Sequence, residues 1–173
     1  NVMTKKKSTK NWLGKHTKDK YVKLSQASGY RSRAFHKLFD IDKKYKLIKS
    51  AKNILELGSS PGSWSEYIVR NFRDKNLVAI DTIIMEPIQN VHFINGDINN
   101  PEDRKKISQI IKSADLVLSD IAPNITGISD IDQSNFSIIA KSILSFCEVN
   151  LELNGLMTMK YFLGSSFEKT HKN

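Results

Sequence analysis

The chain has 173 residues, of which 39% are hydrophobic and 26% are charged, so it suits one globular domain and is short for two. A single cysteine, Cys147, excludes a disulfide framework, and with four scattered histidines we expect no metal site. No apolar run approaches the roughly 18 to 20 residues that cross a bilayer, so we expect no membrane partner. Because the chain begins with Asn1, we expect a fragment of a longer protein.

Positive charge is concentrated at the N-terminal end. Residues 1–46 carry 14 Lys and Arg against 3 Asp and Glu, whereas the remaining residues carry 13 against 15. We therefore divide the chain into a basic arm, residues 1–30, and a domain, residues 31–173. A basic arm on a near-neutral domain is typical of a protein that binds a polyanion such as RNA. For residues 1–10 a solvated lysine-rich tail remains the alternative.

The first half of the chain predicts one helix followed by a strand–helix–strand unit. Apolar residues recur at helical spacing over residues 32–48, with Ser32 as a possible cap. A short buried strand over residues 53–57 follows, then a helix over 63–72. Two further strands are expected at residues 76–81 and 92–96.

The second half continues the alternation. Residues 101–113 begin with a proline and two acids, which favour a helix N-terminus. A strand over 115–120, an amphipathic helix over 133–153 and a strand over 155–162 complete the pattern. Short apolar strands that alternate with helices predict an α/β fold with a doubly wound, mainly parallel sheet.

The turn after the first strand, "LGSSPGSWS", is the expected ligand site, because ligands bind beyond the carboxyl ends of such strands. Gly58 and Gly62 permit a sharp turn and a close approach to a ligand. Their spacing matches neither G-x-G-x-x-G nor G-x-x-x-x-G-K-[ST], so a pyrophosphate ligand is disfavoured. Glu56, just before the turn, is placed to meet a positive group.

S-adenosylmethionine fits this turn, since it carries an adenosine, an α-amino group and a sulfonium but no phosphate. Asp81 ends the second strand and is placed for ribose hydroxyls, and Asp97 follows the third strand near an adenine edge. Each carboxylate alone would be read as a cap or a solvated loop residue, but acids at successive strand ends favour the cofactor. For Trp64, packing under the turn and contact with the cofactor both remain open.

Two lysines and an aspartate stand out elsewhere. Asp120 ends the fourth strand in "LSDIAPN", and Lys160 lies inside the apolar segment "MTMKYF". A buried ammonium is costly unless it is paired or neutral, so we expect Lys160 to be a neutral base. Lys37, beside Leu38 on the first helix, is either a surface lysine or a second functional cation.

The segments "SRAFHKL", "LELGSSPGSWS", "LSDIAPN" and "MKYF", in this order, resemble the FtsJ/RrmJ family of RNA ribose 2′-O-methyltransferases. The resemblance covers about residues 10–164 and implies a Rossmann-like class I methyltransferase fold with helices on both faces of the sheet. It implies a catalytic Lys-Asp-Lys-Glu tetrad whose first three members are Lys37, Asp120 and Lys160. The implied cofactor contacts are Gly58, Pro61, Gly62, Trp64, Asp81, Asp97 and Asp120.

The sequence departs from the family at its C-terminal end. The glutamate of the tetrad has no counterpart, since Glu168 follows Lys160 too closely to stand on a later strand. The family's last helix and final strand pair are also missing, so we expect the domain of residues 31–173 to be C-terminally incomplete.

The expected function is therefore S-adenosylmethionine-dependent methylation of a ribose 2′-hydroxyl in RNA, by a monomer. Ribosomal RNA of the large subunit is the favoured substrate because we see no added domain, and transfer RNA comes second. Residues 10–23 look most like the single-domain family members, including the mitochondrial ribosomal RNA enzymes. A catalytically silent RNA-binding module is the alternative. An amino-group methyltransferase is disfavoured because "SDIAPN" lacks a double proline and an aromatic residue. The compartment stays open between mitochondrion, nucleus or nucleolus, and cytoplasm, but we expect no secretion.

Overall fold

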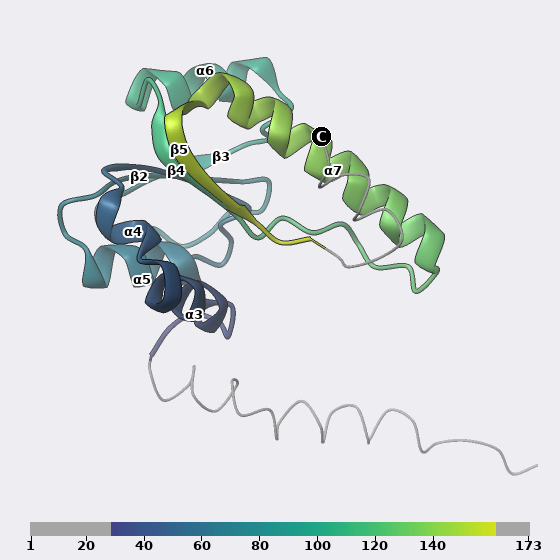
Figure 1. The fold of residues 1–173 in the computed structure, drawn as a ribbon, viewed down its shortest axis with the longest axis horizontal. Helices are drawn as coiled ribbons and strands as arrows, with labels where there is room; N and C mark the ends of the chain where they lie inside the picture. The colour runs from purple at the N-terminus through teal and green to yellow at the C-terminus, as the bar shows by residue number, and fades with distance from the viewer. Residues whose placement is uncertain (1–28, 162–173) are drawn as a thin grey trace, which may run out of the picture.

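The computed structural model describes residues 29–161 and shows one parallel sheet of five strands (Figure 1). The strand order is β3-β2-β1-β4-β5, and every neighbouring pair is parallel. The strands are β1 (Asn53–Leu57), β2 (Asn76–Asp81), β3 (Val91–Asn95), β4 (Ala114–Ser119) and β5 (Leu151–Met159). The order reverses between β1 and β4, and in such sheets the crevice at the reversal is where a ligand binds.

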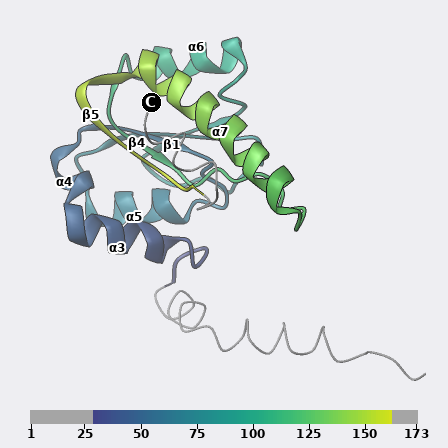
Figure 2. The same ribbon diagram turned by 45° about the vertical axis from the view of Figure 1, so that its right-hand side comes forward.

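Helices cover both faces of the sheet, which confirms the expected architecture (Figures 1 and 2). On one face lie α3 (Phe35–Tyr45), α4 (Leu47–Ser50) and α5 (Ser63–Asn71). On the other face lie α6 (Pro101–Ile110) and α7 (Ser129–Asn150). Each layer buries its own apolar cluster against the sheet, the first around Leu38 and Ile68, the second around Phe146.

The strand predictions hold because the sheet is covered on both faces. Covered parallel strands read as continuous apolar runs rather than as alternating ones. In β1 the last four residues are all buried, and Glu56 is the one acid among them. Strands β1 and β2 have the expected bounds, and β3 and β4 are displaced by one residue.

The helix expected over residues 32–48 is wrong in two respects. It begins at Phe35, with Ala34 at the cap position, so Ser32 lies too early to cap it. The Ser32 hydroxyl instead accepts the Ala34 N–H at 3.2 Å and is hydrogen-bonded to the Ser63 hydroxyl at 2.6 Å. It also breaks at Lys46, whose φ is 57°. The buried Asp42 carboxylate accepts the Ile48 N–H at 3.0 Å, so it stabilises the start of the separate helix α4.

The last two expected boundaries are wrong as well. The long helix runs from Ser129 to Asn150 rather than over 133–153, and β5 starts at once at Leu151, which pairs with Ala114. Strand β5 ends at Met159, so Lys160 follows the strand instead of lying inside it. By contrast, α6 begins as expected, with Pro101 in its first turn and the Asn100 side chain accepting the Glu102 N–H at 2.9 Å.

No helix between residues 29 and 161 combines the length and the apolar character needed to cross a membrane.

Candidate active site

The strand register brings four of the predicted site residues to one edge of the sheet. Leu57 at the end of β1 pairs with Ile80 of β2 and with Ser119 of β4, and Ser119 pairs with Met159 of β5. The next residue along each strand is therefore Gly58, Asp81, Asp120 or Lys160. The lysine and the aspartate of the predicted tetrad are neighbours because they follow adjacent parallel strands in register.

The turn from β1 to α5 needs glycine at both ends, since Gly58 has a φ of 77° and Gly62 a φ of 102°. A Cβ on Gly58 would lie 2.6 Å from Cγ1 of Ile121, in the loop after β4. A Cβ on Gly62 would lie 2.7 Å from Cδ1 of Ile88 and 3.2 Å from Sδ of Met85. The close approach that these glycines permit in this structure is therefore to side chains of the protein itself.

A wide cleft of about 820 Å³ opens beyond the carboxyl ends of β1, β2 and β4. Gly58, Asp81, Asp97 and Asp120 all line it. The Asp81 carboxylate accepts the N–H groups of Ser60 and Ile83, both at 2.8 Å, so its orientation is fixed.

A second carboxylate of the wide cleft is held in the same way. The Asp97 carboxylate accepts the backbone N–H of Asn99 at 2.8 Å. These two acids therefore have defined positions with lone pairs left for a ligand.

The lining of the wide cleft fits S-adenosylmethionine. Three carboxylates line it, and among residues 29–161 no lysine, arginine or histidine does. Such a surface disfavours phosphate and suits hydroxyl donors and a positive charge. Apolar walls of Ile83, Ile98, Ile138 and Ile139 are suited to the faces of a base. Asp81 would hold ribose hydroxyls and Asp97 an adenine edge, as the sequence predicts.

A second, smaller cleft of about 330 Å³ lies on the other side of Asp120. Lys160 Nζ lies 2.9 Å from Oδ1 of Asp120, and Lys37 Nζ lies 3.2 Å from the same oxygen. Lys160 also donates to the Asp120 carbonyl at 3.0 Å. The three residues predicted from the resemblance thus form one contiguous group that lines this cleft.

The two lysines differ in their surroundings. The Lys160 side chain is 34% exposed and that of Lys37 is 53% exposed. The apolar burial expected for Lys160 is therefore wrong, because its ammonium sits past the end of β5 against a carboxylate. Lys37 reaches the same carboxylate from α3, which Leu38, the next residue, fixes in the core.

Glu56 lies under the turn, in a narrow pocket that Gly58, Trp64 and Asp120 also line. Its carboxylate accepts a hydrogen bond from the Ser65 hydroxyl and is 2% exposed. Burial raises the pKa of Glu56 from 4.5 to about 8, and the nearby charges of Asp120 and Asp81 act in the same direction. A cation in the narrow pocket would stabilise the ionised form.

The remaining predicted cofactor residues lie apart from the wide cleft. The Trp64 indole N–H donates to the Ala34 carbonyl at 2.7 Å, and its ring packs in the core at the wall shared by the narrow pocket and the smaller cleft. Pro61 lines the narrow pocket, whereas Gly62 packs against the loop that follows β2. Their roles as cofactor contacts stay predictions, and Glu168 lies outside the described residues.

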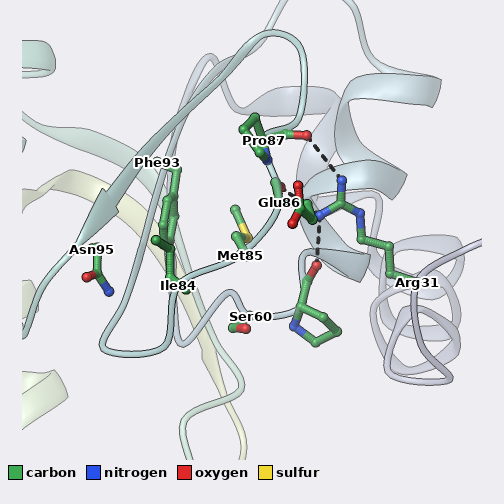
Figure 3. A pocket seen from close by; sticks show the side chains of 9 residues that line it. Arg31, Ser60, Ile84, Met85, Glu86, Pro87, Phe93 and Asn95 are labelled. Carbon is green, nitrogen blue, oxygen red and sulfur yellow. Dashed lines mark hydrogen bonds between the residues drawn. The ribbon is translucent and has the colours of Figure 1, made fainter.

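Arg31 is a site-supporting residue that the sequence did not single out. Its guanidinium donates to the carbonyls of Pro61, Glu86 and Pro87 at 3.1, 2.7 and 3.2 Å. These bonds join the glycine turn to the loop after β2, at the rim of an open cavity of about 930 Å³ (Figure 3). Only the folded loops bring these three acceptors together. The one sequence feature that points to Arg31 is its position directly before the segment "SRAFHKL".

The sequence also did not single out the isoleucines that line the wide cleft, among them Ile121 and Ile138. Ile121 follows Asp120, and Ile138 stands on α7 with 63% of its surface exposed. No local sequence pattern marks Ile138 as a residue of the cleft. Among residues 29–161, no group of three or more His, Cys, Asp or Glu is placed to hold a metal ion.

A parallel sheet with this strand order, an acidic cleft at its reversal point and a lysine pair beside it define a Rossmann-like methyltransferase. Residues 30–173 match the FtsJ-like methyltransferase family, and the chain belongs to that family.

Known proteins of this family resemble nearly the whole chain. The chain is 43% identical over 168 residues to "Ribosomal RNA large subunit methyltransferase E" of Pelagibacter ubique, covering 96% of this chain and 83% of the relative. It is 40% identical to the protein of the same name from Legionella pneumophila, and the match covers 98% of this chain and 84% of that relative. Among solved structures, a putative ribosomal RNA methyltransferase from Plasmodium falciparum superposes with a TM-score of 0.79 at 33% identity. The superposition covers 83% of this chain and 84% of that one.

Proposed function

We propose that the protein transfers a methyl group from S-adenosylmethionine to a ribose 2′-hydroxyl of large-subunit ribosomal RNA. The observation that carries the proposal is the position of Asp120, which lines both the acidic wide cleft and the smaller cleft with two lysines. The names of the similar proteins from Pelagibacter ubique and Legionella pneumophila support ribosomal RNA as the substrate. We also propose that the protein acts as a monomer.

S-adenosylmethionine supplies an electrophilic methyl group on a sulfonium. In the smaller cleft, Lys160 is placed to take the proton of the attacking hydroxyl. Asp120 holds Lys160 in place, and Lys37 contacts the same carboxylate. Alignment of the two substrates on either side of Asp120 contributes further, since positioning alone supplies about 7 to 11 kcal/mol in well-oriented reactions.

The direct test is methyl transfer to unmodified large-subunit ribosomal RNA and, in parallel, to transfer RNA. The RNA is digested to nucleosides after the reaction, and the products are identified by mass spectrometry. We expect a 2′-O-methylnucleoside from ribosomal RNA and none with Asp120→Asn. A base-methylated nucleoside would contradict the proposal, and methylation of transfer RNA alone would replace it with the second candidate.

Cofactor binding has its own test, because Asp81 lines the wide cleft but not the smaller one. Calorimetry with the Asp81→Ala variant should show weaker binding of S-adenosylmethionine by about tenfold, the loss expected for one charge-assisted hydrogen bond. The exposed Asp74→Ala variant, at the far end of α5, serves as the control. Tighter binding of NAD than of S-adenosylmethionine would contradict the assignment of the cleft.

A further inference from the structure

The loop between β3 and α6 brings Asp97 into the wide cleft, so the shape of this loop decides what the carboxylate can contact. Oδ1 of Asp97 accepts the backbone N–H of Asn99 at 2.8 Å and the side-chain amide of Asn99 at 3.1 Å. Because both bonds engage Oδ1, Oδ2 is the oxygen that we expect at the adenine edge. The direction of Oδ2 depends on how the backbone of Asp97 is held.

Asp103, the third residue of α6, holds that backbone. An acid at this position commonly stabilises the helix N-terminus through the helix dipole or by a bond to the N–H of the cap residue. The cap residue here is Asn100, but Oδ2 of Asp103 accepts the N–H of Asp97 at 3.0 Å. The Asp103 carboxylate therefore reaches past the end of the helix and fixes the loop of the wide cleft.

The Asp103 carboxylate is itself fixed in place. The residue is 7% exposed, and its Oδ1 lies 2.7 Å from Nζ of Lys106. The Lys106 ammonium, together with the Asp97 N–H, holds the pKa of Asp103 below its ordinary value of 3.8. The carboxylate is therefore ionised at neutral pH and binds the Asp97 N–H through a charge-assisted hydrogen bond.

Glycine at position 96 makes room for this contact. A Cβ on Gly96 would lie 2.5 Å from both Cγ and Oδ2 of Asp103. Gly96 does not share the positive φ of Gly58 and Gly62. Space for the Asp103 carboxylate, rather than a special backbone conformation, is therefore what glycine provides at this position.

A fixed Asp97 carboxylate can distinguish adenine from hypoxanthine. Adenine presents an exocyclic amine, which donates to a carboxylate, whereas hypoxanthine presents a carbonyl oxygen in the same place. A carboxylate that cannot turn away leaves that oxygen facing a second acceptor, with no proton between them. The discrimination should therefore depend on how firmly the backbone of Asp97 is held.

We propose that Asp103 is a positioning residue, which orients Asp97 and so makes the wide cleft selective for adenine over hypoxanthine. This inference rests on the proposed function for the identity of the cofactor, but it does not depend on which RNA is methylated.

The test is calorimetry of the full chain with S-adenosylhomocysteine and with S-inosylhomocysteine, which carries hypoxanthine. The unaltered protein should bind the first at least about tenfold more tightly, and Asp103→Ala should reduce this ratio to about threefold or less. Asp103→Asn, whose amide oxygen can still accept the Asp97 N–H, should keep most of the ratio. An Asp103→Ala protein with an unchanged ratio, whatever its absolute affinities, would overturn the proposal.

The matched control is Glu102→Ala, which removes an exposed acid from the same turn of α6. This variant loses the same charge near the helix N-terminus but keeps the bond from Asp103 to the Asp97 N–H, so its ratio should equal that of the unaltered protein. A ratio lowered equally in Glu102→Ala and Asp103→Ala would show that the helix charge, and not the contact with Asp97, is responsible.

Gly96→Ala tests the same contact from the other side. The added Cβ should displace the Asp103 carboxylate, so this variant should lower the ratio as Asp103→Ala does. The double variant should have the same ratio as either single variant, because both changes break one contact. Losses of selectivity that add in the double variant would overturn the proposal.

The two proposals can fail separately, because these titrations contain no RNA. Selective binding by the unaltered protein, lost in Asp103→Ala, would support the positioning role even if no RNA were methylated, and that second result would refute the proposed function alone. An unaltered protein that binds the two ligands equally would overturn the positioning role.

Discussion

Lys160 and Lys37 share one oxygen of Asp120, yet only Lys160 also contacts the Asp120 carbonyl. If Lys160 takes the hydroxyl proton, Lys160→Ala should lower kcat by about 10² to 10⁴-fold. Binding of S-adenosylmethionine should stay nearly unchanged, because Lys160 does not line the wide cleft. Single-turnover kinetics and calorimetry provide the two measurements.

The matched variant is Lys160→Arg, which preserves charge and length. A guanidinium does not lose its proton at working pH, so this variant should be nearly as inactive as Lys160→Ala. An active Lys160→Arg protein would show that this residue acts by charge or position and not as a base.

Glu56 makes stability depend on pH. Its pKa is about 8 in the folded protein and 4.5 as an ordinary carboxyl, so between these values the unfolded chain binds fewer protons than the folded protein. The free energy of unfolding should therefore fall as pH rises through this window, by up to about 1.4 kcal/mol per pH unit. The Glu56→Gln protein should not show this fall, so its free energy of unfolding should increase relative to that of the unaltered protein between pH 5 and 8.

Urea denaturation at several pH values measures the effect. Glu148→Gln, an exposed acid on α7, is the control and should follow the unaltered protein. A Glu56→Gln protein whose advantage is the same at pH 5 and pH 8 would show that Glu56 is ionised throughout.

At the scale of elements, the glycine turn offers a matched pair of substitutions. Gly58 and Gly127 have φ values of 77° and 85°, so alanine at either position costs about 1 to 2 kcal/mol of backbone strain. At Gly58 a Cβ would also lie 2.6 Å from Ile121, whereas at Gly127 it meets nothing within 4 Å. Gly58→Ala should therefore destabilise the protein more.

Gly58→Ala should also weaken S-adenosylmethionine binding, since Gly58 and Ile121 both line the wide cleft. Denaturation and calorimetry on both variants separate the two effects. Equal losses of stability in the pair would mean that the loop carrying Ile121 moves aside without cost.

How far the sequence predicts these elements depends on the range of the interactions that set them. β1 and β2 have the predicted bounds because their apolar runs reflect burial on both faces. The break at Lys46 escapes prediction because it depends on the Asp42 carboxylate reaching Ile48. The end of α7 escapes it because pairing with Ala114 draws Leu151 into a strand.

The same distinction holds for the site. Acids and lysines at strand ends are predictable, since parallel strands bring their carboxyl ends to one edge. The burial of Lys160 was mispredicted because the end of β5 is set by pairing, not by composition. Arg31 and the isoleucines of the wide cleft depend on how loops and α7 pack, which no local pattern records.

At the scale of the whole molecule, charge is the dominant asymmetry. Residues 1–23 hold eight lysines against one aspartate and lie outside the described residues. Deleting them should weaken RNA binding and flatten the plot of log K against log salt, because fewer counterions are released. Fluorescence titrations of ribosomal RNA at several salt concentrations measure the slope.

The control for the deletion is a full-length chain in which glutamine replaces the lysines at positions 5, 6, 7, 10, 15, 18, 20 and 23. This chain should show the same flattened slope if charge alone is responsible. A slope unchanged by either alteration would show that the segment does not neutralise phosphates.

The two clefts meet at Asp120, which is the only one of residues 29–161 that lines both. Neither ligand therefore has to pass through the space of the other to reach solvent. Addition of the two substrates should follow a random order, with initial-rate lines that intersect and with both binary complexes on the productive route. Spent cofactor can then be exchanged for fresh cofactor while the RNA remains in place, so the slow departure of a large, highly charged substrate need not govern every turnover.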